Sequence, residues 1–493
     1  MCRRAAVGQV AAVLVTLMVA VPGVNADCLD TVGYSALKAE LGERVPTGRG
    51  VLVTQVEGSE KLDGRNSGWA PDASTAGLAG KSFRLPALPS EHATMVGLLF
   101  YGSGSMAPSI AEIECYPSGL WASDPGGFLR PGTKLLPMAS RTVLANHSYV
   151  GAVEGSADRR VEMPERLDYL VAMDDFVQVV GVNNAPQVHE LWQCTYNAIV
   201  VGCPSERHAI GTLPLGSELY GAGRAKPELV APMPSTSEAT AVVSSAAAML
   251  MGFARSQGSA ISTGSYVSPR TGRRVYHAEA SEVIKAALLA GAERAQRVEP
   301  RSARGRGGRA RPTGPQNGMD PRLGAGSLNV RNSYYVLAAG EQDGVEGESA
   351  DCPRVLKALG FDYNPAFGGA QGTARRACYR LVGSAGGVRL RAVLAWNLRV
   401  NESRDHWDGR ATLYDLDLKL YDLDTSEVIP VAQSDSWVDN AETIRAAVIP
   451  GHAYELRVVC AARQSDFLWD YALAWQMGDV GRRRSRRGVS VQR

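Results

Sequence analysis

A run of hydroxyl side chains opens the small, apolar stretch PSTSEATAVVSSAAAML at residues 234–250. Its apolar side chains recur at helical spacing, which predicts a helix with a buried face. Ser235 or Thr236 can cap this helix, so Ser237 would lie in the first turn, where free backbone N–H groups and the helix dipole favour negative charge. A serine in that position could be a nucleophile. Taken alone, however, the stretch is better explained as a capping cluster on a core helix.

A nucleophilic serine needs a general base and a carboxylate that orients the base. His92, one of seven histidines, stands at the start of an apolar helix pattern at residues 91–100, and Glu57 directly follows the apolar run VLVTQV at residues 51–56. Functional groups gather at the carboxyl ends of strands in open α/β sheets. Glu57 and His92 are therefore candidate partners of Ser237. Each also has a simpler explanation, as a solvated acid and as a polar residue at a helix start.

The elements around these residues alternate between apolar runs and helical patterns. Buried strands are predicted at 51–56, 141–148, 176–182 and 197–202, and helices at 91–100 and 280–292. Strands that are almost continuously apolar and separated by helices are typical of a parallel sheet covered on both faces. The sequence therefore predicts an α/β domain that carries the candidate residues.

A second domain is predicted after residue 345, because the pattern there changes to period two. Alternating apolar residues occur at 388–398, 415–422 and 453–460. Repeated strands of this kind, with turn residues between them, indicate an antiparallel β-sandwich. A chain of 493 residues is long enough for two domains. We predict the domains at 27–341 and 345–480, followed by a basic tail at 481–493.

Taken in order, these stretches resemble the subtilisin-like serine proteases (subtilases). The family's serine motif reads Gly-Thr-Ser-x-Ala-Thr-Pro-x-Val-Ala-Gly, and residues 235–245 read STSEATAVVSS. Four further stretches are similar to family segments: HATMVGL (92–98) to the histidine motif, NHSYVG (146–151) to the substrate cleft, GVNNA (181–185) to the oxyanion asparagine, and KPELVAP (226–232) to the lead-in of the serine motif. The likeness covers roughly residues 49–340.

The resemblance implies a subtilisin-like three-layer fold and a secreted serine endopeptidase that acts on polypeptides. Ser237 would be the nucleophile, His92 the base and Glu57 the orienting acid. Asn183 would donate to the oxyanion, with Asn184 as the alternative.

Three departures from the family pattern favour a second hypothesis, a subtilase-fold binding protein that has lost proteolysis. The acid is Glu57 where the family usually has aspartate, so an extra methylene must be accommodated. Ser235 and Ala93 stand where the family has glycines. If position 235 requires a positive φ, serine costs energy there.

The N-terminus has the pattern of a signal peptide over residues 1–26. Arg3 and Arg4 precede a short apolar core, and Val24-Asn25-Ala26 offers a small-residue cleavage site. No second apolar run approaches the ~18–20 residues of a membrane helix. We therefore expect export to the periplasm or the extracellular space, without a membrane span.

The small net charge of +2 excludes a protein that binds polyanions over its whole surface. Excess basic residues lie in an Arg/Gly-rich segment at 294–318 and in the tail at 481–493. We interpret the first as a solvated loop; polyanion binding is the weaker alternative, and no specific nucleic-acid partner is predicted.

Export also predicts that some cysteines pair in disulfides. Seven of the eight cysteines would remain after cleavage, and Cys194–Cys203 and Cys352–Cys378 are the nearest pairs in sequence. Spacing alone does not give the connectivity, and no spacing suggests a zinc site.

No cofactor is required by the predicted chemistry, although calcium is possible in the β-sandwich. Asp415, Asp417, Asp439 and Glu442 carry the oxygen ligands that calcium prefers. The simpler explanation of this pattern is that the acids alternate along the strands and face water.

Overall fold

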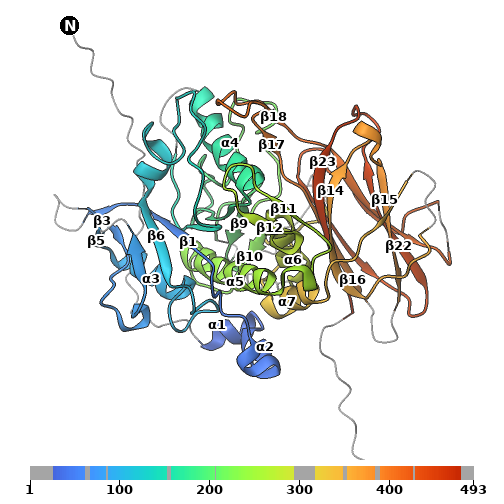
Figure 1. Cartoon of the computed structure of the whole chain (residues 1–493), viewed down its shortest axis with the longest axis horizontal. Helices are drawn as coiled ribbons and strands as arrows, with labels where there is room; N and C mark the ends of the chain where they lie inside the picture. Colours follow the sequence, from blue (N-terminus) through green and yellow to red (C-terminus); the bar gives the residue numbers. More distant parts are fainter. Residues whose placement is uncertain are drawn as a thin grey trace, which may run out of the picture.

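Two parts lie side by side in the computed structural model, an α/β domain and an antiparallel β domain (Figure 1). The structure describes residues 26–61, 67–84, 87–152, 157–205, 207–293, 317–347, 352–383, 389–425 and 428–478. The predicted signal peptide up to residue 25, residues 294–316 of the Arg/Gly-rich segment and the basic tail lie outside these ranges.

A seven-stranded sheet forms the centre of the first domain. Its order is β10 (Leu229–Val230), β9 (Ile199–Gly202), β8 (Val177–Gly181), β7 (Leu144–His147), β1 (Val53–Glu57), β6 (Glu112–Pro117) and β4 (Ser82–Arg84). Every neighbouring pair of strands is parallel. The predicted parallel sheet is therefore confirmed.

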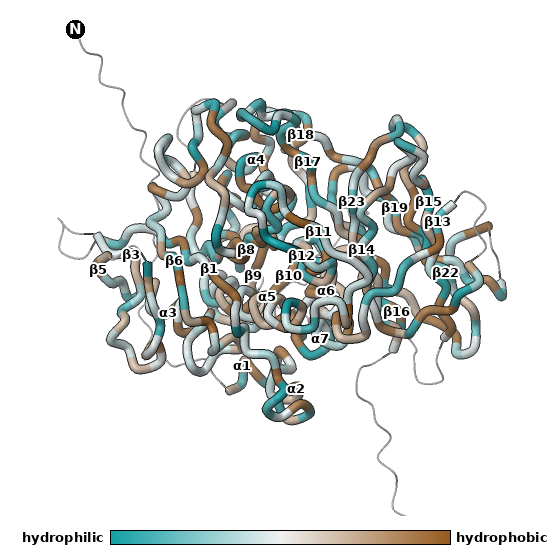
Figure 2. The backbone as a smooth tube through the Cα atoms, in the orientation of Figure 1, coloured by the Kyte–Doolittle hydropathy of each residue, from teal (hydrophilic) through white to brown (hydrophobic). Residues whose placement is uncertain are grey.

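Helices cover both faces of this sheet, because its strands are apolar on both sides. Val53 of β1 belongs to a core that it shares with α3 (Glu91–Phe100), α5 (Thr236–Gln257), α6 (Ser281–Gly291) and α7 (Val330–Ala338). Val56 of the same strand belongs to a second core, with α4 (Ala157–Asp174) and a group of aromatic side chains. Figure 2 shows hydrophobic colour along these central strands.

The helix α5 is buried along nearly its whole length and packs against α3, β7, β8 and β9. Its many alanines, serines and Gly252 allow this close approach on all sides. In the described part of the chain, Thr236–Ala260 alone has the length and hydropathy of a membrane-crossing helix, and 83% of its most apolar window is buried in the protein. Such burial is typical of the central helix of a large domain.

Smaller elements complete the first domain. They are α1 (Ala26–Thr31), α2 (Tyr34–Leu41), a three-stranded sheet of β2 (Glu60–Lys61), β3 (Ser67–Ala70) and β5 (Leu88–Pro89), and the hairpin β11 (Ser265–Val267) with β12 (Arg274–Tyr276). Short helical turns occur at η1 (Gly42–Arg44), η2 (Ala76–Leu78), η3 (Gly119–Ser123), η4 (Gly258–Ala260) and η5 (His277–Glu279), with η6 (Ala370–Gly372) in the second domain.

The second domain is a β-sandwich, as the period-two pattern predicts. One sheet has the order β13 (Val345–Glu346), β15 (Arg376–Val382), β22 (Ala453–Cys460), β19 (Leu416–Asp422), β20 (Ala432–Ser434). The other has the order β14 (Leu359–Phe367), β23 (Trp469–Met477), β16 (Arg389–Ala395), β21 (Ala441–Ala447). A ribbon of β17 (Arg399–Val400) and β18 (Ala411–Thr412) extends from it, and all strand pairs in this domain are antiparallel. Large apolar residues such as Trp396 and Trp475 fill the space between the sheets.

The two domains share one hydrophobic core, which the sequence did not predict. Alanines of the four-stranded sheet, including Ala395, Ala441, Ala472 and Ala474, belong to the same cluster as the buried face of α6. Because alanine has a short side chain, α6 can lie close to β16 and β23. The β-sandwich is therefore packed onto the α/β domain through an apolar face.

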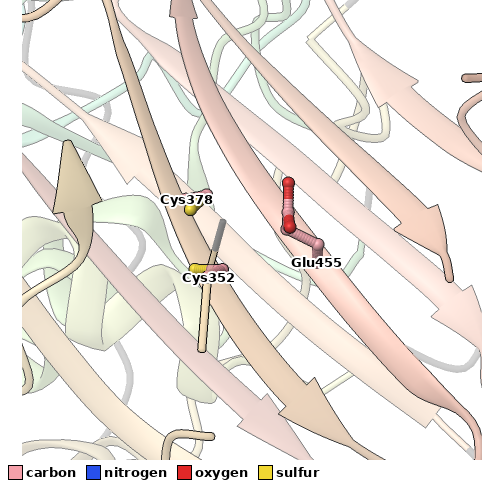
Figure 3. A group of neighbouring side chains, drawn as sticks. All are labelled: Cys352, Cys378 and Glu455. Atoms are coloured by element: carbon pink, nitrogen blue, oxygen red, sulfur yellow. The ribbon is translucent and has the colours of Figure 1, made fainter. Parts of the chain in front are cut away.

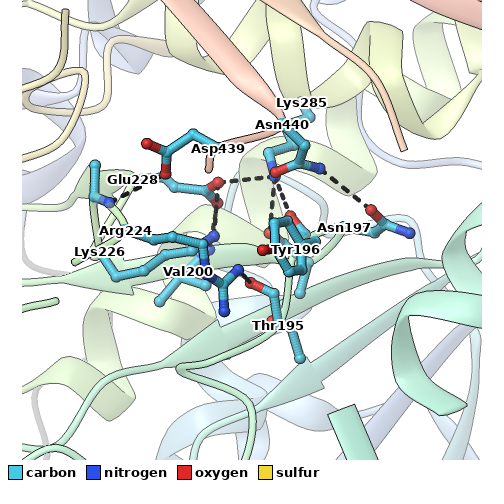
Figure 4. A network of polar contacts seen from close by, with 12 residues as sticks. Thr195, Tyr196, Asn197, Val200, Arg224, Lys226, Glu228, Lys285, Asp439 and Asn440 are labelled. Atoms are coloured by element: carbon cyan, nitrogen blue, oxygen red, sulfur yellow. Dashed lines mark hydrogen bonds and ion pairs between the residues drawn. The ribbon is translucent and has the colours of Figure 1, made fainter. Parts of the chain in front are cut away.

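A buried network of charges lies beside this interface (Figure 4). Glu228 accepts from Lys226 and from Lys285 of α6, each at 2.8 Å. Asp439 of the β-sandwich accepts from the backbone N–H of Ala225 at 3.2 Å. Burial lowers the pKa of Lys226 to about 8, although Glu228 opposes the shift. Two buried cations thus depend on one carboxylate for compensation.

Candidate active site

Three neighbouring strands of the parallel sheet deliver the polar residues of the candidate site. Glu57 is the last residue of β1, Ser148 follows β7, and Asn183 and Asn184 lie just beyond β8. The carboxyl ends of parallel strands meet at one edge of a sheet, which is where sites form in open α/β folds.

Glu57 and His92 form an ion pair at this edge. Nδ1 of His92 lies 2.8 Å from Oε2 of Glu57. The Glu57 side chain is only 1% exposed, whereas that of His92 is 23% exposed, so the histidine keeps one side toward solvent. A carboxylate on Nδ1 holds the imidazole in the tautomer whose Nε2 can accept a proton. The longer glutamate therefore reaches the histidine without a gap.

Gln55 fixes the position of Glu57. Residues two apart on a strand share a face. Gln55 and Glu57 both face α3, whose second residue is His92. Nε2 of Gln55 donates to Oε1 of Glu57 at 2.8 Å and to the carbonyl of Ala93 at 2.9 Å. Its Oε1 accepts from the hydroxyl of Tyr101. The buried amide of Gln55 thus connects β1, the carboxylate of Glu57 and α3 by hydrogen bonds.

The pKa of His92 is raised above its ordinary value of 6.5. Burial by itself lowers the pKa, but the negative charge of Glu57 and the hydrogen bond to it outweigh burial. Glu60 and Glu238 add weaker attraction in the same direction. The surroundings of His92 therefore favour an imidazolium, the form that a general base reaches after it has taken a proton.

A capping box builds the start of α5. Oγ of Ser235 accepts from the backbone N–H of Glu238 at 3.3 Å and donates to Oε2 of that residue at 2.6 Å, which in turn accepts from the backbone N–H of Ser235 at 3.1 Å. Ser235 has φ −126° and ψ 157°, an ordinary extended conformation. This position therefore does not require glycine, and serine stabilises the helix start there.

Ser237 lies in the first turn of α5, half-buried, and contacts the segment after β7. Its hydroxyl donates to the carbonyl of Ser148 at 3.1 Å, and the hydroxyl of Ser148 donates to the carbonyl of Ser237 at 2.9 Å. Within the described residues, Ser237 makes no hydrogen bond to His92. The side chain would have to rotate away from Ser148 before its proton could pass to His92.

The two asparagines after β8 differ in what they touch. Oδ1 of Asn184 accepts from the backbone N–H of Thr236 at 2.8 Å, which holds this side chain against the start of α5 beside Ser237. The amide of Asn183 instead donates to the carbonyl of Gln187 at 3.0 Å, within its own loop. The geometry therefore favours Asn184, the alternative in the sequence analysis, over Asn183 as the donor to an oxyanion.

No three of the acids considered for calcium place carboxylate oxygens within 4.8 Å of one another in the described structure. Asp417 pairs with Lys419 at 3.1 Å, whereas Asp439 accepts from Ser436 at 2.8 Å. Glu442 accepts from Ser434 and from the backbone of Ser436. Groups of side chains with metal-binding geometry in the described ranges lie elsewhere. Calcium binding at Asp415, Asp417, Asp439 and Glu442 remains a prediction.

Sequence reasoning did not single out two residues of the candidate site. Gln55 carries a usable signal, because it is an amide two positions before an acid in a buried strand. Ser148 was included only as part of the stretch NHSYVG, and its contact with Ser237 had no signal, because it joins residues far apart in the sequence.

Comparisons with known proteins give structural likeness only. No family model matches the chain, and no curated protein matches it. Solved structures with similarity include tripeptidyl peptidase 2 (11% identity, TM-score 0.29, 79% of this chain and 40% of that chain). They also include MycP1 from Mycobacterium smegmatis (15% identity, TM-score 0.34, 62% and 84%) and the PatG macrocyclase in complex with peptide (13%, TM-score 0.36, 61% and 95%). This chain thus spans 40% of the length of tripeptidyl peptidase 2. At such identities and TM-scores, activity has to be argued from the side chains.

Proposed function

We propose that this protein is an exported serine endopeptidase with Glu57, His92 and Ser237 as its catalytic residues. The observation that carries the proposal is the 2.8 Å ion pair between Glu57 and His92. It lies at the sheet edge beyond which Ser148 contacts Ser237 in the first turn of a helix. A buried acid, a histidine and a serine at a helix N-terminus together suit acyl transfer.

In the proposed reaction, Oγ of Ser237 attacks the carbonyl carbon of the scissile peptide bond and transfers its proton to Nε2 of His92. Glu57 stays ionised and stabilises the imidazolium. The backbone N–H of Ser237 and the amide of Asn184 stabilise the tetrahedral oxyanion. His92 then gives the proton to the leaving amine, which leaves an acyl-enzyme on Ser237. Water, activated by His92, hydrolyses this ester.

The second candidate function is peptide binding without proteolysis. One observation favours it: the hydroxyl of Ser237 donates to the carbonyl of Ser148 at 3.1 Å. The proton that His92 would have to accept is therefore already engaged in another hydrogen bond. In resting serine hydrolases this geometry is often loose and tightens with substrate. A stable Ser237–Ser148 bond in the presence of substrate would leave the serine without its base.

An active-site serine probe of the fluorophosphonate type distinguishes the two functions. Under the endopeptidase proposal it labels the wild-type protein and not Ser237→Ala. Ser256→Ala is the matched control, because Ser256 is exposed at the other end of α5 and should not alter labelling. Digestion of denatured casein should follow the same order. A folded wild type that resists the probe and leaves casein intact would exclude the endopeptidase.

A further inference from the structure

Two cysteines and one acid converge in the β-sandwich (Figure 3). The sulfur atoms of Cys352 and Cys378 and a carboxylate oxygen of Glu455 all lie within 4.8 Å of one another. Cys352 is 5% exposed and Cys378 is 0% exposed, so both thiols are buried. No disulfide joins any cysteine in the described residues.

The backbone brings these residues together through β15. Cys378 lies in β15, and Glu455 lies in β22, which pairs with β15 in antiparallel fashion. Three residues after Cys352, Val355 forms a bridge with Arg380 of β15, and the backbone N–H of Leu356 donates to the Arg380 carbonyl at 2.8 Å. Cys352 is therefore held beside β15 by the hydrogen bonds of its own segment.

The charges around the group disfavour a metal cation. Glu455 accepts from Arg376 at 3.2 Å and also from Arg457, so its negative charge is already compensated by two guanidinium groups. A hydrogen bond from Cys352 lowers the pKa of Cys378; burial and the negative charge of Glu455 oppose this shift, and Arg376 and Arg457 add to it. Positive surroundings stabilise a thiolate, which is the form that attacks disulfides.

We propose that Cys352 and Cys378 are a modification site at which a structural disulfide forms, independently of the proposed peptidase activity. The oxidant is a disulfide, either of a small thiol compound or of a thiol oxidoreductase. The Cys378 thiolate attacks one sulfur of that disulfide and expels the other as a thiol. The Cys352 thiolate then attacks the Cys378 sulfur of the mixed disulfide and expels the second thiol. Two electrons pass from the two cysteines to the oxidant, and both cysteine protons end on the released thiols.

This bond would join the segment that precedes β14 to β15 of the five-stranded sheet. The chain between Cys352 and Cys378 forms β14, which belongs to the four-stranded sheet and contacts α7 of the first domain. Cys378 belongs to the five-stranded sheet. The covalent loop therefore encloses the strand that leads from the domain interface into the sandwich. Closing such a loop removes conformational freedom from the unfolded chain.

The other pair near in sequence provides an internal control. Cys194 donates to the carbonyl of Leu213 at 3.9 Å, whereas Cys203 contacts the hydroxyl of Ser205 at 3.2 Å. The two thiols thus have separate partners. We expect both to stay reduced under conditions that oxidise Cys352 and Cys378.

Peptide mapping of the full-length protein tests the proposal. Because both thiols are buried in the folded protein, the purified protein is first unfolded and reduced, then refolded with oxidised glutathione, unfolded again without reductant, alkylated and digested. We expect one cross-linked peptide pair, containing Cys352 and Cys378 and lighter by two hydrogens than the reduced pair, and alkylated Cys194 and Cys203. Alkylation of Cys352 and Cys378, or a cross-link to another cysteine, would overturn the proposal. So would stoichiometric zinc or copper in the purified protein that Cys352→Ser abolishes.

A stability measurement completes the test. Reduction of the oxidised wild type should lower the ratio of folded to unfolded protein by a factor on the order of 10². The double variant Cys352→Ser/Cys378→Ser should lose this dependence on reductant, while Cys194→Ser should keep it. If the variants do not fold, the peptide map of the wild type still decides the question. An oxidised wild type whose stability does not respond to reductant contradicts a structural role.

Discussion

Replacement of Glu57 by glutamine tests the centre of the candidate site with almost no change of shape. Oε1 of Glu57 accepts from Nε2 of Gln55 at 2.8 Å, so the oxygen of the new amide should stay on that side. The new NH₂ group would then face Nδ1 of His92, where Oε2 lies at 2.8 Å. Nδ1 would have to accept a hydrogen bond, which moves the imidazole proton to Nε2. In that tautomer His92 cannot take the proton of Ser237.

The expected loss follows from this change of tautomer. In serine proteases, kcat falls by ~10⁴-fold when the histidine is held with the wrong nitrogen protonated. This factor corresponds to a loss of about 5 kcal/mol of transition-state stabilisation. Glu57→Asp is the matched control, because it keeps the charge and the tautomer and only shortens the side chain. We expect a much smaller loss for Glu57→Asp than for Glu57→Gln.

The pH dependence gives a second readout of the same substitution. The pKa of His92 is raised in the folded protein, and a general base must be unprotonated. The acidic limb of kcat/KM should therefore lie above the ordinary histidine value of about 6.5. Because the raised pKa favours the folded state at low pH, the stability from the pair is present below about 6.5 and lost as pH rises through the folded pKa. Glu57→Gln should therefore destabilise the protein more at acidic than at alkaline pH.

The assays are peptide hydrolysis for activity and NMR titration of the His92 ring for its pKa, with circular dichroism to confirm folding. NMR reports on His92 even if the protein is inactive. A folded Glu57→Gln variant that keeps kcat within tenfold of wild type would refute the role of Glu57. An unchanged His92 pKa in that variant would refute the electrostatic argument.

Three further predictions concern other parts of the structure. Asn184→Ala should lower kcat by ~10²–10³-fold with little change in KM, as expected for an oxyanion donor, and Asn183→Ala should have a much smaller effect; the reverse order would place the donor on Asn183. Ser235→Ala should lower the free energy of unfolding in urea by about 1 kcal/mol, and Ser235→Gly by only a few tenths; equal costs would contradict the capping role. Glu228→Gln should cost about 3–5 kcal/mol in urea unfolding, because it leaves two buried lysines without an anion; a cost below about 1 kcal/mol would show that the network contributes little.

The sequence by itself determined four of the seven strands of the parallel sheet, the sandwich that follows it, and the order of the candidate residues. Apolar runs around Val53, Leu144, Val177 and Ile199 became strands of one parallel sheet, and the period-two stretches became an antiparallel sandwich. Such patterns are local, since the face that a side chain occupies follows from the geometry of a single strand or helix. The rule that sites form at the carboxyl ends of parallel strands also sufficed to predict that Glu57 and His92 lie together. Glu57 lies at a strand end, and His92 lies at the start of the helix that covers this strand.

The contacts between distant segments were decided by the tertiary structure alone. Sequence spacing could not show that Ser237 donates to Ser148, or that Asn184, and not Asn183, lies against the start of α5. Nor could it show that Cys352 lies beside Cys378 while Cys194 and Cys203 have separate partners. These outcomes depend on the register between strands and on how loops close over the sheet, and a shift of one residue changes the partner of every side chain. Position 235 is a further example. The family pattern has a glycine there, and only the φ angle of the folded chain shows that serine fits this position.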